Sequence, residues 1–141
     1  MSSENNTPDI LLYGFGRRFP GFAQQLFGLE TNALYRKYFI IVLGEAGYGL
    51  ADELVCDYII CPQSLELSGR IKCSSVITCG MNTRCTLSFS SIDGDKALLS
   101  VNRRIDFGEK SIHQCERPVD YYEAFSAYEN LVLQGLTILT M

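Results

Sequence analysis

The turn Gly14–Arg18, with the sequence Gly-Phe-Gly-Arg-Arg, has residue types that can bind a phosphate group. It follows an apolar run that predicts a strand and precedes the segment Phe19–Leu29, which predicts a helix. Glycines at such a turn let backbone N–H groups approach a phosphate, and the helix N-terminus adds a favourable dipole. We therefore expect Gly14 and Gly16 to offer backbone donors and Arg17 or Arg18 to supply the countercharge.

The match of this turn to known phosphate-binding fingerprints is incomplete. The dinucleotide fingerprint requires glycine where this chain has Phe19, and the next glycine is Gly21. The chain also lacks the G-x-x-x-x-G-K-[ST] loop that positions the β- and γ-phosphates of ATP, so no ATPase or ATP-dependent ligase activity is predicted. The alternative interpretation is a plain tight turn between strand and helix, with both arginines solvated.

A second group of candidate ligand-binding residues follows the apolar run Val76–Cys79. Ligands of open α/β sheets collect outside the carboxyl ends of the strands. Gly80 and Asn82 are predicted at that edge, where Asn82 would offer a side-chain amide. The turns Gly44–Gly47 and Pro62–Ser64 are expected at the same edge.

The residues that could support nucleophilic or acid–base catalysis are few. His113 is the sole histidine, and it lies far in sequence from the predicted parallel strands, so we expect it on the surface. Cys79 ends a predicted strand, but no neighbouring residue supplies a base or lowers the pKa of its thiol. Arg103 and Arg104 could hold an anion, or decorate a strand edge where charge blocks aggregation. We name no catalytic residue and favour a non-catalytic protein over an enzyme.

The chain contains 6 cysteines but no Cys-x-x-Cys pair. Structural zinc sites normally bring their ligands in close pairs, so no metal and no cofactor is predicted. Cys56, Cys61 and Cys79 lie in apolar runs, where a reduced cysteine behaves as a small hydrophobic residue.

Composition limits the partners. The net charge of −4 argues against nucleic acid, because domains that bind polyanions normally carry a basic excess.

The first eight residues, Met1–Pro8, are polar and predict a disordered tail without a signal peptide or membrane anchor. No apolar run reaches the roughly 18 residues of a membrane span. We expect a cytoplasmic protein that contacts neither nucleic acid nor membrane.

The elements that must position the candidate residues follow from hydrophobic patterning. Short apolar runs, each stopped by glycine or proline, predict a parallel sheet with right-handed crossovers. Helices are expected over Phe19–Leu29 and Tyr48–Val55. The four predicted strands are Ile10–Tyr13, Phe39–Leu43, Tyr58–Cys61 and Val76–Cys79.

The pattern changes to a period of two after Gly80, which predicts an antiparallel extension from Thr86 to about Cys115. Asp93-Gly94 is a hairpin signal, and Lys110–Cys115 is predicted as the third strand of the extension. Asp120 and Glu123 have the spacing of a capping arrangement for a last helix. The apolar face of that helix should seal the sheet. It would carry Tyr122, Phe125, Tyr128 (or Glu129), Val132, Leu136 and Leu139.

These expectations combine into one fold. We predict a single α/β domain over residues 9–141, with a small Rossmann-like parallel sheet, an antiparallel hairpin region and a closing C-terminal helix.

The stretch Val76–Asn82, followed by Thr86–Ile92, resembles the later half of the central, ATP-hydrolysing domain of Mur ligases. In that family a similar strand leads through a polar stretch to small antiparallel strands and then to a helix rich in alanine and asparagine. The resemblance covers about residues 57–140, where the matching helix would be Asp120–Leu136. The family's Gly-Lys-Thr/Ser loop, magnesium-binding acidic residues and carbamylated lysine have no matching positions here, so no catalytic residue is carried over.

Two functions remain open. The resemblance implies a non-catalytic Mur-ligase-like scaffold or interaction module, linked by analogy to cell-wall metabolism. Such a module would bind another protein or a second copy of itself, through the tyrosine-containing helix or an exposed sheet edge. The alternative is a binding domain or enzyme for a nucleotide or other phosphorylated ligand at Gly14–Arg18. Its site would also include Gly80 and Asn82.

Overall fold

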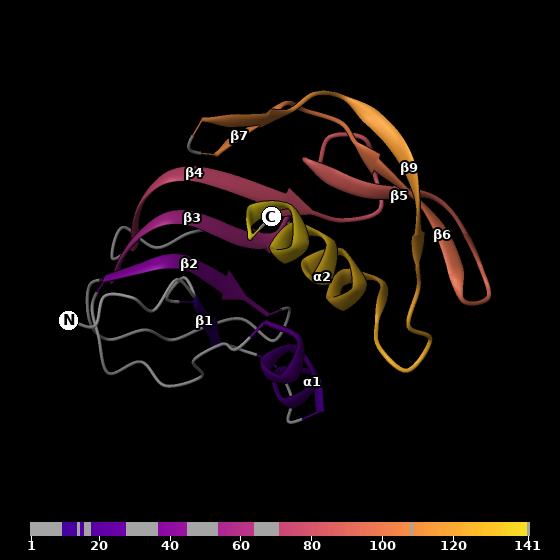
Figure 1. Cartoon of the computed structure of the whole chain (residues 1–141), viewed down its shortest axis with the longest axis horizontal. Coiled ribbons are helices and arrows are strands. Elements are labelled where there is room, and N and C mark those ends of the chain that lie inside the picture. Colours follow the sequence, from indigo (N-terminus) through magenta and orange to yellow (C-terminus); the bar gives the residue numbers. More distant parts are fainter. Residues whose placement is uncertain are drawn as a thin grey trace. The chain divides into compact units, whose positions relative to one another are not determined.

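The computed structural model describes residues 10–13, 15, 18–27, 37–44, 54–63, 71–107 and 109–140. The fold is mixed α/β. A 7-stranded sheet has the strand order β1-β2-β3-β4-β5-β6-β9, and β7 and β8 form a separate 2-stranded sheet (Figure 1). The chain divides into two compact units, Met1–Ile60 with Leu65–Val76, and Cys61–Ser64 with Ile77–Met141. Strands β3 and β4 contribute residues to both units.

The first unit contains the parallel part of the sheet. Strand β1 (Ile10–Tyr13) pairs in parallel with β2 (Lys37–Leu43), and β2 pairs in parallel with β3 (Leu54–Pro62). Leu11, Ile41 and Ile59 occupy one row across these strands, and none of them is exposed to solvent. Continuous burial of this kind is what apolar runs on a parallel sheet require, so the predicted strands are confirmed.

Strands β2 and β3 and the first helix all begin before their predicted bounds. Strand β3 begins at Leu54, so the end of the helix expected over Tyr48–Val55 is a strand, and residues 48–53 lie outside the described residues. Strand β3 already pairs with β2 at Val55. Pairing with the neighbouring strand therefore makes the chain extended several residues before the most apolar part of β3. Helix α1 (Arg18–Phe27) buries Phe19 and Ala23, in agreement with the predicted helix.

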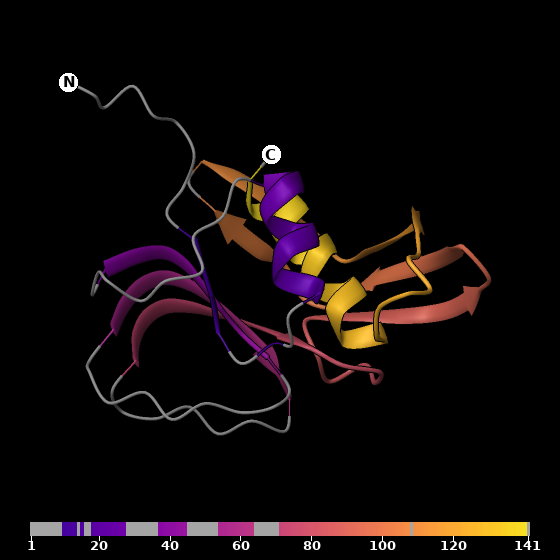
Figure 2. The ribbon, with the colours of Figure 1, turned by 90° about the horizontal axis from the view of Figure 1, so that it is seen from below.

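The second unit is built on three antiparallel strands. Strand β5 (Leu87–Asp93) pairs with β6 (Lys96–Val101) through a turn at Gly94, whose φ of 63° favours glycine. Strand β6 then pairs with β9 (Cys115–Asp120). Figure 2 shows the β5–β6 hairpin from below. Strand β5 also touches the end of β4 (Ile71–Cys79), in parallel, at Cys79 and Leu87.

The third strand of the extension is therefore β9. The predicted strand Lys110–Cys115 is an antiparallel strand over Lys110–Ile112, but its predicted place beside the β5–β6 hairpin is wrong. Strands β7 (Ile105–Phe107) and β8 (Lys110–Ile112) pair with each other instead. Ile105 and Phe107 are buried, so this small hairpin has an apolar side of its own and does not need a place in the large sheet.

Helix α2 (Ala127–Leu139) begins later than the predicted capping arrangement. Its N-cap is Ser126, whose side chain accepts from Glu129 N while the Glu129 side chain accepts from Ser126 N. Asp120 is instead the last residue of β9, where it forms an ion pair with Lys96. The predicted cap is wrong because pairing with β6 keeps the chain extended to Asp120.

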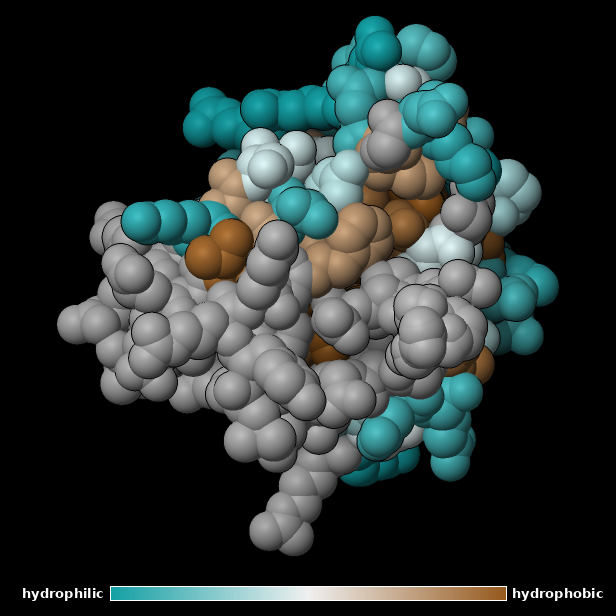
Figure 3. All heavy atoms as spheres, turned by 60° about the vertical axis from the view of Figure 1, so that its left-hand side comes forward, coloured by the Kyte–Doolittle hydropathy of each residue, from teal (hydrophilic) through white to brown (hydrophobic). Residues whose placement is uncertain are grey.

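The last helix belongs to the core. It packs against β5, and its buried positions include Leu131, Val132, Leu133 and Leu136. Tyr122, expected on its apolar face, precedes the helix and is 39% exposed. Hydrophobic residues also reach the surface among hydrophilic ones on the face of the described residues drawn in Figure 3. No helix among the described residues is long and apolar enough to cross a membrane.

Candidate functional site

The predicted phosphate-binding turn is described at one of its four candidate positions. Arg18 is the first residue of α1 and is exposed. Gly14, Gly16 and Arg17 lie outside the described residues, so that site stays a prediction.

The turns that follow β3 and β4 meet, as the sequence predicts for the carboxyl ends of these strands. Asn82 Nδ2 donates to Gln63 Oε1 at 2.6 Å, and Arg84 N donates to Asn82 Oδ1 at 2.9 Å. Gln63 Oε1 also accepts from Cys85 Sγ at 3.5 Å. The Asn82 amide therefore ties one turn to the other, and a ligand would have to compete with these bonds. Gly80 and Asn82 stay candidate ligand-binding residues on the prediction alone.

The thiol proposed as a possible nucleophile is buried. Burial raises the pKa of Cys79 well above its ordinary value, and the neighbouring Cys61 and Cys85 raise it further. Burial likewise raises the pKa of Cys56, to about 12. These thiols stay protonated at neutral pH, which makes them poor nucleophiles. No group of three or more His, Cys, Asp or Glu residues within the described ranges could hold a metal ion.

The structure also describes His113 and Arg104, two further candidates from the sequence. His113 is exposed, as expected for a surface histidine. Arg104 Nε lies 2.7 Å from Asp106 Oδ1, which also accepts from Ser111 Oγ at 2.6 Å. The Ser111 hydroxyl and the Arg104 guanidinium lower the pKa of Asp106. Arg104 therefore has an intramolecular carboxylate partner rather than an open position for an anion.

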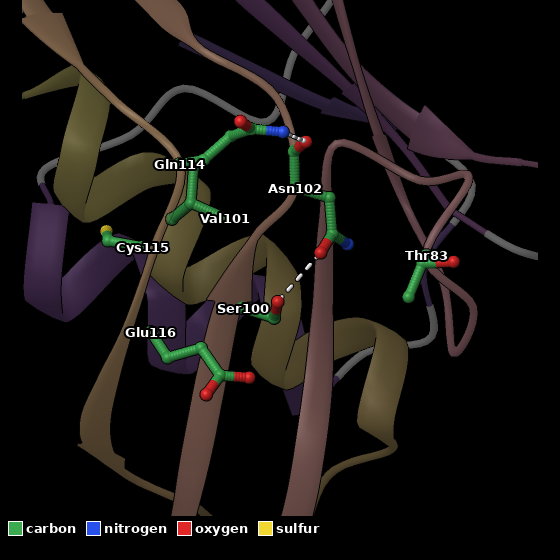
Figure 4. A pocket seen from close by; sticks show the side chains of 7 residues that line it. All are labelled: Thr83, Ser100, Val101, Asn102, Gln114, Cys115 and Glu116. Carbon is green, nitrogen blue, oxygen red and sulfur yellow. Dashed lines mark hydrogen bonds between the residues drawn. The ribbon is translucent and has the colours of Figure 1, made fainter.

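A hollow of about 570 Å³ lies where β6 ends and β9 begins (Figure 4). It joins these two strands to the loop between β4 and β5. Its lining consists of Thr83, Ser100, Val101, Asn102, Gln114, Cys115 and Glu116. Most of these side chains carry hydrogen-bonding groups, which distinguishes the hollow from the apolar core.

The strand register explains why polar groups gather there. Ser100 on β6 stands opposite Ser88 on β5 and opposite Glu116 on β9. Because side chains alternate along a strand, this polar row lies on the opposite face from the buried Leu99 and Val101. In Figure 4 the Cys115 side chain points away from Ser100 and Glu116, as alternation requires.

Asn102 is the most firmly held side chain of the hollow. Its Nδ2 donates to Cys85 O at 3.1 Å and to Ser88 Oγ at 2.9 Å, while its Oδ1 accepts from Ser100 Oγ at 2.7 Å. A backbone carbonyl can only accept, so the bond to Cys85 fixes which way the Asn102 amide points. Its backbone is held as well, since Asn102 N donates to Thr86 O at 2.9 Å.

A hydrogen bond to a backbone carbonyl also fixes the orientation of the Gln114 amide. Its Nε2 donates to Asn102 O at 2.7 Å, which leaves Gln114 Oε1 without a hydrogen bond in the described part of the chain. Glu116 Oε2 accepts a short hydrogen bond from Ser90 Oγ. The hollow thus holds a preorganised set of polar atoms, several of which keep hydrogen-bonding capacity toward solvent.

Sequence reasoning missed this hollow, although one signal pointed to it. The alternation of polar and apolar residues from Thr86 to Ser90 marks a strand with one polar face. The partners of that face come from β6 and β9, and the local pattern does not specify their register.

The comparisons with known proteins add no relative to this picture. No family model, no curated protein and no solved structure shows a significant match to this chain.

Proposed function

We propose that this chain is a non-catalytic binding module and that the hollow lined by β6 and β9 is its recognition site. One observation carries the proposal: Asn102 and Gln114 are locked by hydrogen bonds to backbone carbonyls at a surface hollow. Polar groups that are already oriented lose little conformational entropy when a ligand binds, which favours recognition.

The kinship to Mur ligases belongs to the same proposal. The order of elements that supports it is a strand ending at Cys79, a polar turn, antiparallel strands and a C-terminal helix. We propose that the chain is a Rossmann-like, reduced relative of that central domain, retained for binding. A role in cell-wall metabolism follows only by analogy.

The proposal is tested by a thermal-shift screen of the full chain. The panel contains primary amines, neutral sugars and polyols, sugar phosphates and nucleotides. A ligand that binds the native state raises the unfolding temperature by mass action. The Gln114→Trp variant fills the hollow, and Glu109→Trp places the same side chain at another exposed position outside it.

We expect one class of compound to stabilise the natural protein and the Glu109→Trp variant but not Gln114→Trp. Stabilisation that persists in Gln114→Trp, or the absence of any stabilising compound, would contradict binding at the hollow. After prolonged incubation with the protein, mass spectrometry should show that the bound compound is chemically unchanged. Conversion of the compound would contradict a non-catalytic role.

A further inference from the structure

We propose that the hollow binds a primary ammonium group, with Glu116 as its counter-ion. The group would come from a small free amine or from a lysine side chain. This inference rests on the binding role proposed above and names the chemical class that the hollow would recognise.

The donors that line the hollow are largely occupied. Both N–H groups of the Asn102 amide are used, by Cys85 O and Ser88 Oγ, and the Ser100 hydroxyl donates to Asn102 Oδ1. One N–H of Gln114 is used by Asn102 O. Among the lining side chains, a ligand rich in acceptors, such as a phosphate, would find only the second N–H of Gln114, the Thr83 hydroxyl and the weakly donating Cys115 thiol as further donors.

The acceptors, by contrast, are open. Gln114 Oε1 and Glu116 Oε1 have no hydrogen bond within the described residues, and the Ser100 oxygen has lone-pair capacity left after donating its proton. These acceptors come from both strands that border the hollow. An excess of acceptors selects a ligand that brings donors.

The charge of the hollow also favours a cationic ligand. Glu116 is its ionisable acidic side chain and is exposed, so its carboxylate meets an incoming ligand directly. Arg84 and Arg103 each follow a lining residue in the chain but do not line the hollow themselves. Arg117 is directed to the other face of β9 by strand alternation.

The hydrogen bond that the Glu116 carboxylate already accepts favours an ammonium ligand over a guanidinium ligand. A guanidinium binds best to both oxygens of a carboxylate in one plane. Glu116 Oε2 already accepts from Ser90 Oγ, which leaves one oxygen for the ligand. A compact ammonium, whose three donors point in different directions, suits one carboxylate oxygen together with the hydroxyl of Ser100, which stands opposite Glu116 in the strand register.

The experiment is calorimetric titration of the full chain with three probes. Putrescine represents free amines, and Nα-acetyl-lysine methylamide represents a lysine side chain in a protein. The Nε-acetylated form of the second probe keeps the shape but removes the charge and is the control ligand. Glu116→Gln removes the carboxylate charge, and Glu109→Gln makes the same change at an exposed glutamate outside the hollow.

We expect one or both amines to bind, and the tighter of the two identifies the source of the ammonium group. Glu116→Gln should weaken binding by about tenfold or more, because it removes a charge-assisted hydrogen bond, while Glu109→Gln should leave affinity unchanged. Affinity should also fall as salt is added.

Equal binding of amines to Glu116→Gln and the natural protein would overturn the inference. So would a neutral sugar that binds at the hollow, with loss in Gln114→Trp, while both amines fail to bind. That second result would leave the proposed binding function intact. If no compound in the screen binds and neither amine binds, both the proposed binding function and the ammonium inference are overturned.

Discussion

Tyr122 and Asn130 are joined by a pair of reciprocal hydrogen bonds. Tyr122 N donates to Asn130 Oδ1 at 2.8 Å, and Asn130 Nδ2 donates to Tyr122 O at 2.9 Å. Asn130 Nδ2 also contacts Phe125 O and Ser126 O, at 3.3 and 3.0 Å. The side chain is 2% exposed, so this buried amide ties Tyr122, Phe125 and Ser126 of the connection between β9 and α2 to the helix.

Replacement of Asn130 by leucine should therefore destabilise the protein strongly. The Tyr122 N–H and the carbonyl groups of Tyr122, Phe125 and Ser126 would lose this partner, which corresponds to about 2–4 kcal/mol of unfolding free energy. Urea denaturation measures this loss. Thr137→Ala, at an exposed position of the same helix, should change stability by less than about 0.5 kcal/mol. Equal effects of the two changes would contradict the role assigned to Asn130.

Two glycines should respond in opposite ways to replacement by alanine. A Cβ at Gly80 would lie 2.8 Å from Cys85 Sγ, so Gly80→Ala should cost about 1–3 kcal/mol of stability. A Cβ at Gly21, inside α1, meets nothing within 4 Å, and Gly21→Ala should stabilise the protein by about 0.5–1 kcal/mol.

A double-mutant cycle isolates the close contact at Gly80. In the background of Cys85→Ala the Sγ atom is absent, and Gly80→Ala should cost less than it does in the natural protein. Chemical denaturation of the four proteins in the cycle gives the coupling. Strict additivity would show that the cost at Gly80 has another origin.

The cysteines should differ sharply in reactivity. Cys115 is exposed, whereas Cys79 is 1% exposed and its pKa is raised well above its ordinary value by burial. Because the thiolate is the reactive form, iodoacetamide should modify Cys115 first and leave Cys79 intact until the protein unfolds. Mass spectrometry of peptides from native and denatured samples measures the order. Alkylation of Cys79 at the rate of Cys115 in the native protein would contradict this prediction.

Stability should fall at alkaline pH, in part because of Cys56. Burial raises the pKa of its thiol from 9.0 to about 12, so the unfolded state loses this proton first as pH rises. Between these two values the unfolded state binds fewer protons than the native state, and the free energy of unfolding decreases with pH. The contribution is fully present below the unfolded pKa and is lost toward the folded pKa.

Urea denaturation over a series of alkaline pH values measures this effect. The Cys56→Ala variant should lose stability less steeply with rising pH than the natural protein does. Cys115→Ala, at an exposed position, should keep the natural slope. A slope that is the same in Cys56→Ala and the natural protein would assign the decline to other groups.

Elements whose patterns are local could be predicted from the amino-acid sequence. The apolar runs at Ile10–Tyr13 and Phe39–Leu43 bury both faces of a strand, and that requirement specifies a parallel sheet without knowledge of any partner. The alternation after Thr86 and the signal at Gly94 likewise specified the β5–β6 hairpin. The meeting of the turns at Gln63 and Asn82 followed from strand direction.

Features that depend on pairing between distant segments could not be predicted in this way. The segment Cys115–Asp120 contains charged residues and Pro118, a weak strand signal, and it becomes β9 because β6 offers it a register. That pairing also delays the last helix until Ser126.

The same pairing places Glu116 opposite Ser100 and creates the polar hollow. Its lining residues come from three separate segments of the chain, and a shift of one residue in register would turn Glu116 to the other face of the sheet. Local patterns specify which face of a strand is polar, but the partner strands specify which polar groups meet.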